Sequence, residues 1–456
     1  MPKEWHLAQV AEIYKKGDPS QPENYRPISL LNIAYKVYAV FLLNRLKRAG
    51  AEARLWPSQY GFRSKRSTTD ALFTVRRKME QAWAWRNGRL HVLALDWRKA
   101  FDCISPEGLF QALSRFGIPR DMIDAIQDIY TDREFSVTDC GRTSMKKAQC
   151  AGISQGCPLS PFLFGIVMTA VMTDAKALLK DKALEAYGRD DLADILFADD
   201  TLLLGVSAKH VEEYAKAIQT TGREYGLEQH WGKVQLISIR SDETLCQPDG
   251  KEVKPRDSMV YLGGLLHENG RAASEFSRRI GMCRGLFKKL TQVWSCARLS
   301  TQRRIEVFNA LILSKLKYGL STLWMGTAEQ RRLDGFHAYC LRRILGIQAA
   351  FISRVSHAKV FEKAAQERVT KQLLKQQLLY FGKIARMGED SVLRRSAFHH
   401  GLMPCTAFYV RKAGRPRKTW TEQLVAEATK LAGSHARLQT LLQDEATWSN
   451  FVSNVP

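Results

Sequence analysis

The sequence predicts an α+β fold, in which a mixed core of strands and helices is followed by a basic, all-helical tail. Short apolar runs with the character of strands alternate with segments of helical spacing over roughly the first 270 residues. From about residue 272 onward, long helical segments rich in Arg and Lys dominate. The 456 residues, 45% of them hydrophobic, suffice for a large core and for about two to four domains.

Each element has its own local signal. Residues 32–46 have apolar side chains at helical spacing, and Thr69 and Asp70 are expected to cap a helix that runs to about Trp85. Further helices are expected over 106–116, 120–131, 158–179 (beginning with Pro158) and 208–225. Strands are expected at 91–95, as a hairpin within 134–150, at 194–197 and 201–206, and over 234–240 and 259–266. Helices follow to 346 and again over 354–456, with an interruption at 401–418.

The charge balance favours a polyanionic partner. The formal net charge is +23, so nucleic acid is the default partner and an anionic membrane surface is the alternative. The nine cysteines form no CxxC pair and no zinc-type cluster, which indicates reduced thiols used as small core residues. No apolar run reaches the ~18 residues that a membrane span needs. These features predict a soluble, intracellular protein.

Three carboxylates mark a candidate site. Asp96 ends a short buried strand, while Asp199 and Asp200 lie between two apolar runs that predict a tight β-hairpin. If these strands share one sheet, the carboxylates converge, and an adjacent acidic pair repels itself unless cations bind. Hard divalent ions take such oxygen ligands, and nucleotidyl transfer uses two ions about 4 Å apart. An Asp pair in a turn can also be ordinary turn chemistry, but the flanking apolar strands favour a metal site.

At this point the motifs resemble those of the reverse transcriptases of non-LTR (LINE-type) retrotransposons. Phe197–Asp200 (FADD) resembles the family's catalytic box, in the variant with Ala in second place. The other blocks occur in the family's order: NYRPISLLN at 24–32, QYGFRSKRSTTD at 59–70, LDWRKAFD at 95–102, GISQGCPLSP at 152–161, Gly226-Leu227 through Lys233, and Tyr261-Leu262-Gly263. The resemblance implies a right-hand polymerase with partial fingers, a palm built of an antiparallel sheet plus helices, and an all-α thumb and C-terminal extension.

The resemblance also implies residue roles. Asp96, Asp199 and Asp200 would hold two Mg²⁺ ions (Mn²⁺ being possible), helped by the backbone carbonyl of Trp97. Phe101 would be a steric gate against a ribose 2′-OH, so that deoxynucleotides are preferred. An RNA-dependent RNA polymerase would tend to carry an Asp at that offset, but here the Asp lies one residue later.

Further residues would contact the substrates. Gln155 and Gly156 would line the floor beneath the incoming nucleotide, where a glycine allows close backbone approach. The implied triphosphate or template contacts in the fingers are Arg63, Lys65 and Arg66, and the implied primer grip is Tyr261, Leu262 and Gly263. Lys233 would be a general acid near the pyrophosphate. His230 and Val234 stand where the family usually has Asn and Thr, so the sequence around Lys233 departs from the family's pattern.

The expected organisation is fingers at 1–90 (truncated at the N-terminus), palm at 91–270, thumb at 271–350 and a basic extension at 351–456. Arginines and lysines of the thumb, including Arg278 and Arg279, are expected to follow a duplex backbone or to form a solvated helix face. Residues 414–418 (GRPRK) resemble an AT-hook core, with a basic loop before Trp420 as the alternative.

The implied partners are an RNA template, a DNA primer or target, and dNTPs, with no membrane, and the implied location is nuclear or ribonucleoprotein-associated. The chain shows no nuclease block and no CCHC knuckle, so a lack of the endonuclease domain is expected. Two hypotheses therefore compete: an active reverse transcriptase and a non-catalytic nucleic-acid-binding remnant. A third, a group II intron maturase, is disfavoured because no HNH-like cluster occurs in the tail.

Overall fold

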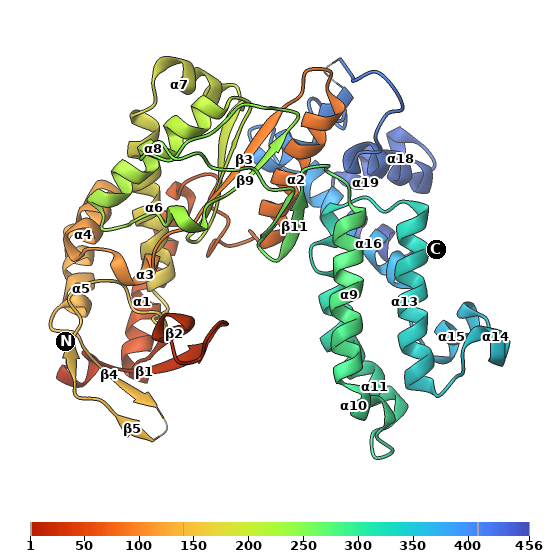
Figure 1. Ribbon diagram of the computed structural model, residues 1–456, viewed down its shortest axis with the longest axis horizontal. Coiled ribbons are helices and arrows are strands. Elements are labelled where there is room, and N and C mark those ends of the chain that lie inside the picture. Colours follow the sequence, from red (N-terminus) through yellow and green to blue (C-terminus); the bar gives the residue numbers. More distant parts are fainter. Residues whose placement is uncertain (1, 140, 408–409, 456) are drawn as a thin grey trace. The chain divides into compact units, whose positions relative to one another are not determined.

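The computed structural model describes residues 2–139, 141–407 and 410–455 (Figure 1). The chain forms two compact units. The first consists of residues 1–67, 91–236 and 242–255, and the second of residues 68–90, 237–241 and 256–456. The first unit mixes strands and helices and the second is mostly helical, which confirms the α+β class. The expected four-part division stays a prediction, and the two units cut across it because residues 68–90 pack with the C-terminal half.

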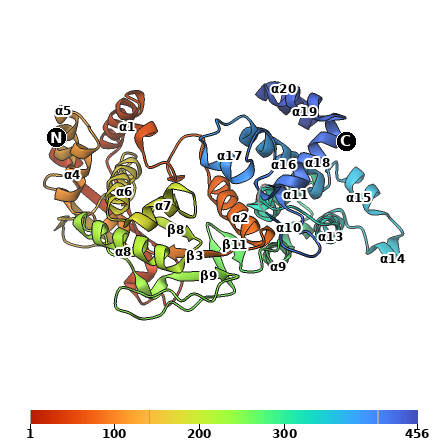
Figure 2. The ribbon, with the colours of Figure 1, turned by 90° about the horizontal axis from the view of Figure 1, so that it is seen from above.

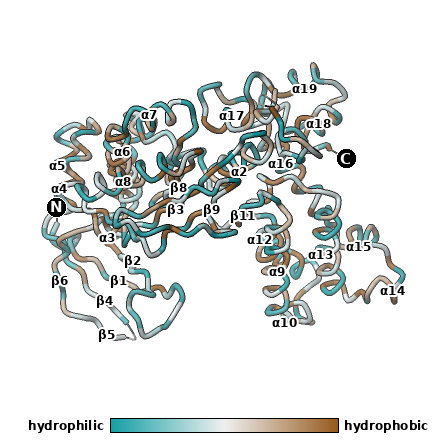
Figure 3. The backbone as a smooth tube through the Cα atoms, turned by 45° about the horizontal axis from the view of Figure 1, so that its top comes forward, coloured by the Kyte–Doolittle hydropathy of each residue, from teal (hydrophilic) through white to brown (hydrophobic). Residues whose placement is uncertain are grey.

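The central sheet of the first unit has the strand order β7-β8-β3-β9. Its strands are β3 (Leu90–Leu95), β7 (Leu192–Phe197), β8 (Asp200–Gly205) and β9 (Gln235–Ile239). β8 runs antiparallel to both β7 and β3. The strands form here because nearly every residue of β3 and β8 is buried, so their apolar runs contribute to the core on both faces (Figure 3).

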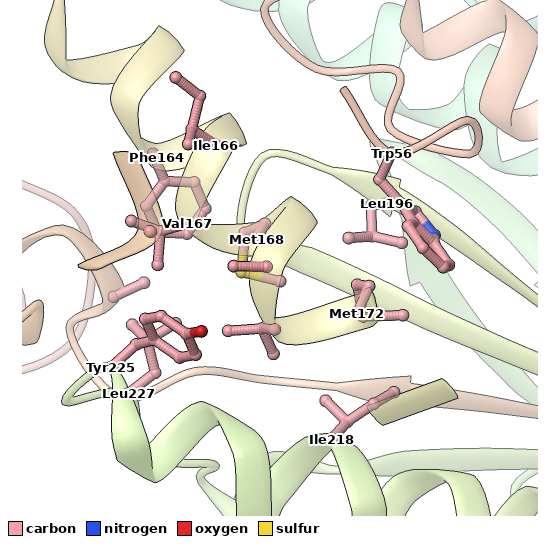
Figure 4. Close-up of a cluster of buried hydrophobic side chains, with 14 of the residues drawn as sticks. Trp56, Phe164, Ile166, Val167, Met168, Met172, Leu196, Ile218, Tyr225 and Leu227 are labelled. Carbon is pink, nitrogen blue, oxygen red and sulfur yellow. The ribbon is translucent and has the colours of Figure 1, made fainter. Parts of the chain in front are cut away.

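Two long helices pack together in the main core of this unit. α6 (Ser160–Ala177) is apolar for most of its length and packs on α8 (Ala208–Glu224). Figure 4 shows side chains of α6 meeting Ile218 of α8 and Leu196 of β7. The sequence analysis expected this helix to begin with Pro158. It begins instead at Ser160, and Pro161 occupies its first turn.

The remaining elements of the first unit surround this core. Its other helices are α1 (Ile33–Arg48), α3 (Ala100–Cys103), α4 (Pro106–Arg115), α5 (Arg120–Tyr130) and α7 (Asp181–Gly188). The caps of α1 and α4 are side-chain oxygens of Asn32 and Ser105, which accept hydrogen bonds from Ala34 N and Gly108 N. The expected hairpin after residue 134 is present as β4 (Glu134–Asp139), β5 (Arg142–Thr143) and β6 (Lys147–Ala148).

Two N-terminal strands were missed by the sequence analysis. β1 (Leu7–Tyr14) pairs antiparallel with β2 (Tyr25–Leu30) and parallel with β4. β1 buries only two of its residues, so its apolar pattern is weak. β2 contains Pro27, which argues against a strand in a central position but is tolerated here because β2 lies at the edge of its sheet.

The second unit is built around α2 (Thr68–Ala84), which Figure 2 shows among the helices of the C-terminal half. Apart from the ends of β3 and β9, its described strands form the hairpin β10 (Ser258–Tyr261) and β11 (Gly264–His267), where the sequence analysis expected one stretch over 259–266. The helices that follow are α9 (Ala273–Lys289), α10 (Thr291–Ser295), α11 (Thr301–Phe308), α12 (Ser314–Lys317) and α13 (Thr327–Leu345). The extension adds α14 (Ala350–Ser353), α15 (His357–Lys363), α16 (Val369–Ala385), α17 (Val392–Ala397), α18 (Trp420–Ala432), α19 (His435–Leu442) and α20 (Glu445–Ser453).

Asp70 holds the extension to α2 and does not cap that helix. The helix begins at Thr68, so Thr69 and Asp70 lie inside its first turn. The buried Asp70 carboxylate accepts hydrogen bonds from Tyr380 Oη (2.9 Å) and Lys383 Nζ (3.0 Å), both on α16. A buried carboxylate needs a cation and donors, and only the tertiary structure brings these two side chains to it.

Trp420 gives the extension a second anchor on α2. Its ring is fully buried and meets Phe73 edge to face at 4.8 Å, and its Nε1 donates to Ser321 O.

In the part of the chain that the structure describes, no helix has the length and apolar character needed to cross a bilayer.

A buried histidine makes the stability of the second unit depend on pH. His337 on α13 is fully buried, stacks on Phe308 and meets Phe361 edge to face, and neither of its ring nitrogens has a hydrogen-bond partner in the described structure. Burial, reinforced by the charge of Lys317, lowers the pKa of His337 to about 4. The unfolded chain, with a histidine pKa of about 6.5, therefore binds the proton more tightly, and stability is lost as the pH falls from about 6.5 toward 4.

Between pH 7 and pH 5 we expect the free energy of unfolding to fall less in the His337→Phe variant than in the parent chain. The difference between the two falls should be about 2 kcal/mol. Phenylalanine keeps the ring contacts with Phe308 and Phe361 but cannot be protonated. Urea unfolding at the two pH values measures the difference. Replacing the exposed His435 by Phe is the control, and an equal change in both variants would contradict the assignment.

Candidate active site

The acidic hairpin has a two-residue turn. Phe197, the last residue of β7, pairs with Asp200, the first residue of β8, so only Ala198 and Asp199 lie between them. Ala198 has a φ of 57°, a left-handed conformation that suits a two-residue hairpin turn. The expected hairpin with carboxylates at its tip is therefore present.

Asp96 lies beside this tip. Leu95, at the end of β3, pairs with Thr201 of β8, so the next residue, Asp96, adjoins Asp200 across the strand pair. Three carboxylates from two places in the sequence thus meet at one end of the sheet. Their convergence required β3 to pair with β8, which the sequence analysis could only assume.

The carboxylates perturb one another. Partial burial, then the charges of Asp199 and Asp96, raise the pKa of Asp200 to about 6. Burial also raises the pKa of Asp199, with Asp96 adding to the rise and Arg26 opposing it. Arg26, on β2, is a residue that the sequence analysis did not single out. The hairpin end therefore carries negative charge that the surrounding protein compensates only in part.

The donor chemistry fits a divalent cation. In the described residues, no three His, Cys, Asp or Glu side chains are already arranged to hold a metal ion. Asp96 Oδ2 is buried, accepts no hydrogen bond from the described residues and lies 3.4 Å from Lys233 Nζ. Oxygen-only ligands of like charge are what hard ions such as Mg²⁺ prefer, and binding would relieve the repulsion.

The segment that carries Lys233 adjoins Asp96 through its backbone. His230 N donates to Asp96 O at 2.7 Å, and Trp97 forms an isolated antiparallel bridge with Gln229. The Trp97 indole is buried and donates to Thr201 Oγ1 at 3.2 Å. Lys233 therefore lies beside a candidate metal ligand although its neighbours His230 and Val234 depart from the family pattern, and its role as a general acid stays a prediction.

Phe101 is held firmly and remains half-buried. Its ring stacks on Phe164 of α6 at 4.6 Å with an interplanar angle of 10°, and Phe62 meets it edge to face. A side chain fixed on two sides can act as a steric barrier on its remaining face. The geometry is compatible with the expected gate, and that role stays a prediction.

Gln155 and Gly156 contact the chain itself. Gln155 Nε2 donates to Asp102 Oδ1 at 3.0 Å, and its backbone carbonyl accepts a hydrogen bond from Ser29 N at 2.7 Å. Gly156 has a φ of 137°, and a Cβ at this position would come within 2.3 Å of Ser29 O. The close approach that requires this glycine is thus to β2, and the expected contact with a nucleotide stays a prediction.

The basic residues of the fingers block stabilise their own loop. Arg63 Nη1 donates to Trp56 O at 3.0 Å and to Gln59 O at 3.5 Å, and the Arg66 guanidinium lies 5.2 Å from the centre of the Tyr60 ring. Lys65 is exposed. None of the contacts of Arg63 and Arg66 described here is with the three carboxylates, so their proposed contact with a triphosphate gains no support from this geometry.

Gln59 contacts the acidic turn directly, which the sequence analysis missed. Its Oε1 accepts hydrogen bonds from Ala198 N (2.9 Å) and Gly61 N (2.8 Å), and its Nε2 donates to Ala198 O (3.2 Å). Gly61 has no room for a side chain, because a Cβ there would lie 2.4 Å from Ala198 N. The available signal was the glycine two residues after Gln59, inside a block already assigned to the family.

A buried carboxylate connects the same loop to β7. Asp194 accepts hydrogen bonds from Trp56 Nε1, Ser58 Oγ, Tyr187 Oη and Tyr214 Oη. Its four donors come from the loop and from α7 and α8, so this hub fixes the strand that leads into the acidic turn.

The expected primer-grip residues lie in the second unit. Tyr261 ends β10 and is buried, and Leu262 and Gly263 form the turn with φ values of 45° and 72°. The Leu262 carbonyl accepts a hydrogen bond from Tyr318 Oη, and the Gly263 carbonyl accepts hydrogen bonds from Arg278 and Arg279.

Both arginines also pair with the buried Glu275. The expectation that Arg278 and Arg279 follow a duplex or face solvent is therefore wrong for Arg279. It is buried, since the carbonyl and the carboxylate draw it inward.

An antiparallel sheet that presents carboxylates at a tight hairpin, packed on long helices, is the palm of a right-hand polymerase. The model of the reverse transcriptase (RNA-dependent DNA polymerase) family matches residues 13–266, more than half of the chain. The chain belongs to this family.

Relatives of the chain come from retrotransposable elements. It is 29% identical over 271 residues to the probable RNA-directed DNA polymerase from transposon BS of Drosophila melanogaster, a match that covers 58% of this chain and 28% of that protein. It is 24% identical to the Pol polyprotein of element R2 of Popillia japonica, with 79% of this chain and 50% of that protein covered. It is 26% identical to the RNA-directed DNA polymerase from mobile element jockey of D. melanogaster, with 76% of this chain and 38% of that protein covered.

The chain thus spans between about a quarter and a half of the length of these relatives. Their names confirm the resemblance to the non-LTR branch of the family. Among solved structures, apo telomerase from Candida tropicalis aligns with a TM-score of 0.43 and 11% identity, covering 99% of this chain and 70% of that one. The family assignment rests on the sequence matches.

Proposed function

We propose that this chain is an RNA-directed DNA polymerase that adds deoxynucleotides to the 3′-OH of a primer. The observation that carries the proposal is the strand register that sets Asp96 beside the Asp199–Asp200 turn. Membership of the reverse transcriptase family supports it. The partners would be an RNA template, a DNA primer or target, and dNTPs, which also accounts for the net charge of +23. Such partners imply a nuclear or ribonucleoprotein location.

Asp96, Asp199 and Asp200 would hold two Mg²⁺ ions, or Mn²⁺ in their place, with the Trp97 carbonyl as a further ligand. When bound, such ions activate the attacking hydroxyl and neutralise the leaving pyrophosphate. Lys233 would have to leave Asp96 when cations bind, which frees its ammonium to donate a proton to the pyrophosphate. Gln155, Gly156, Lys65 and the turn at Tyr261–Gly263 would position the nucleotide and the primer.

Primer extension on an RNA template annealed to a DNA primer tests the proposal. With dNTPs and Mg²⁺ we expect products longer than the primer, and with rNTPs far fewer. Binding of the template–primer without any extension would instead identify a non-catalytic nucleic-acid-binding remnant. Extension on a DNA template but not on an RNA template would contradict the RNA-directed assignment.

We expect the Phe101→Val variant to incorporate rNTPs at least about tenfold better relative to dNTPs, because a smaller side chain leaves space for the 2′-OH. Phe101 is half-buried, so Phe110→Val, which also removes a partly buried ring packed on the same core, is the matched control. The measurement is kcat/KM for dCTP and for CTP with each variant. An unchanged ratio in Phe101→Val would show that the ring does not contact the sugar.

A further inference from the structure

Three cations lie around one tryptophan in the second unit, and a fourth lies close to one of them. The Arg417 guanidinium lies 4.0 Å from the centre of the Trp83 ring, Lys412 Nζ lies 5.7 Å from it, and the Arg240 guanidinium lies 6.0 Å from it. Arg271 is close enough for its charge, with that of Arg240, to lower the pKa of Arg417, an effect to which burial contributes most. We call Trp83 and these four cations the Trp83 patch.

The patch is built by contacts that fix its shape and leave its charge in place. Arg240 donates to the carbonyls of Ala82, Trp85 and Arg86 at the C-terminal end of α2. Arg417 donates to Asn269 O, and Trp83 Nε1 donates to Glu268 O. Carbonyl oxygens hold the side chains but carry no net charge, so the guanidinium groups keep theirs.

No carboxylate in the described structure forms an ion pair with any of the four cations. Nearby Arg411 shows the contrast, because its charge is compensated by an ion pair with Glu422. Like charges gathered in this way repel, and an anion is what would relieve the repulsion. Lys412 and Arg271 are exposed, so an anion can reach them.

We propose that the Trp83 patch binds the phosphate backbone of a nucleic-acid strand, as a site separate from the acidic hairpin. Cations around an aromatic ring are typical of surfaces that hold phosphates and stack against bases without reading sequence. The inference rests on the proposed function only for its partner, nucleic acid. It also favours the basic-loop alternative for residues 414–418, since Arg417 lies against Trp83.

The test compares two charge-matched double variants of the full chain. Arg271→Gln with Lys412→Gln removes the two exposed cations of the patch. Arg331→Gln with Lys359→Gln removes one exposed arginine and one exposed lysine of α13 and α15. Fluorescence anisotropy, without dNTPs, measures binding of labelled single-stranded RNA and of duplex DNA of the same sequence between about 50 and 200 mM salt.

We expect the patch variant to bind at least about tenfold more weakly and the α13–α15 variant to bind like the parent chain. The slope of log K against log salt should fall by about 1.4 for RNA or 1.8 for duplex DNA, since each lost phosphate contact contributes about 0.7 or 0.9. The nucleic acid that shows the larger loss is the one that the patch holds.

An equal loss of nucleic-acid affinity in both variants would mean that only net charge matters. No loss of affinity in either variant would show that the Trp83 patch does not bind nucleic acid. If the patch variant instead loses binding only to phosphatidylserine vesicles, the surface contacts a membrane and the inference is wrong. Because the assay measures no catalysis, a parent chain that binds through the patch but extends no primer would defeat the proposed function alone.

Discussion

Replacement of Asp199 by Asn is expected to reduce nucleotide incorporation by at least about 10³-fold, equivalent to about 4 kcal/mol of transition-state stabilisation. The amide keeps the shape of the side chain at the tip of the β7–β8 hairpin but removes the negative charge that a divalent cation requires. Single-turnover extension of an RNA-templated primer measures the loss. Asp128→Asn, the same chemical change on the exposed face of α5, should leave the rate unchanged.

The loss in Asp199→Asn should occur without unfolding. Burial and the neighbouring Asp96 raise the pKa of Asp199, so its charge disfavours the metal-free fold at neutral pH. A carboxyl with a raised pKa contributes stability below that pKa and loses it as the pH rises through it. The variant should therefore unfold at the same temperature as the parent or higher at pH 7.5 without metal. Incorporation above a tenth of the parent rate would rule out Asp199 as a ligand.

The second large effect is expected from Gly61→Ala. The new Cβ would lie 2.4 Å from Ala198 N and 3.0 Å from the Phe197 carbonyl carbon, and backbone atoms cannot move aside as the end of a side chain can. The turn that carries Asp199 must shift by several tenths of an ångström or more, and the hydrogen bonds from Gln59 weaken. A displacement near 1 Å at a reacting centre costs roughly 10² in rate.

The matched control is Gly285→Ala on the exposed face of α9, where an added Cβ meets nothing within 4 Å. Alanine favours a helix, so this variant should be as stable as the parent chain or slightly more stable. Measuring kcat and the Mg²⁺ concentration for half-maximal rate separates a displaced ligand from general damage. Equal activity of Gly61→Ala and Gly285→Ala would show that the turn tolerates the added methyl group.

The Gln59→Leu variant isolates the hydrogen bonds from the steric effect. It removes both contacts to Ala198 without adding a group at Gly61, so we expect a smaller loss, of roughly tenfold. Weaker binding of Mn²⁺ to the free protein, measured by electron paramagnetic resonance, would show that Gln59 positions the carboxylates. Unchanged Mn²⁺ binding would assign it to packing alone.

Local pattern predicted much of the fold. The apolar runs at β3, β7 and β8 and the helical spacing of α1, α4, α5 and α8 were strong enough to place each element within a few residues. The N-terminal strands were missed because β1 buries little and β2 contains Pro27, so neither has the alternation that identifies a strand. β1 also pairs with β4, more than a hundred residues away, and a local pattern carries no information about such pairing.

For the candidate site too, some features followed from the sequence and others only from the tertiary structure. The sequence by itself determined the identity of Asp96, Asp199 and Asp200 and the hairpin that carries two of them, because a tight turn between apolar strands is encoded locally. Only the tertiary structure decided that β3 pairs with β8 and that Gln59 holds the turn, because both depend on packing between distant segments. It also decided that Arg63 and Arg279 bind backbone carbonyls, since the use of a cation depends on which oxygens folding brings within reach.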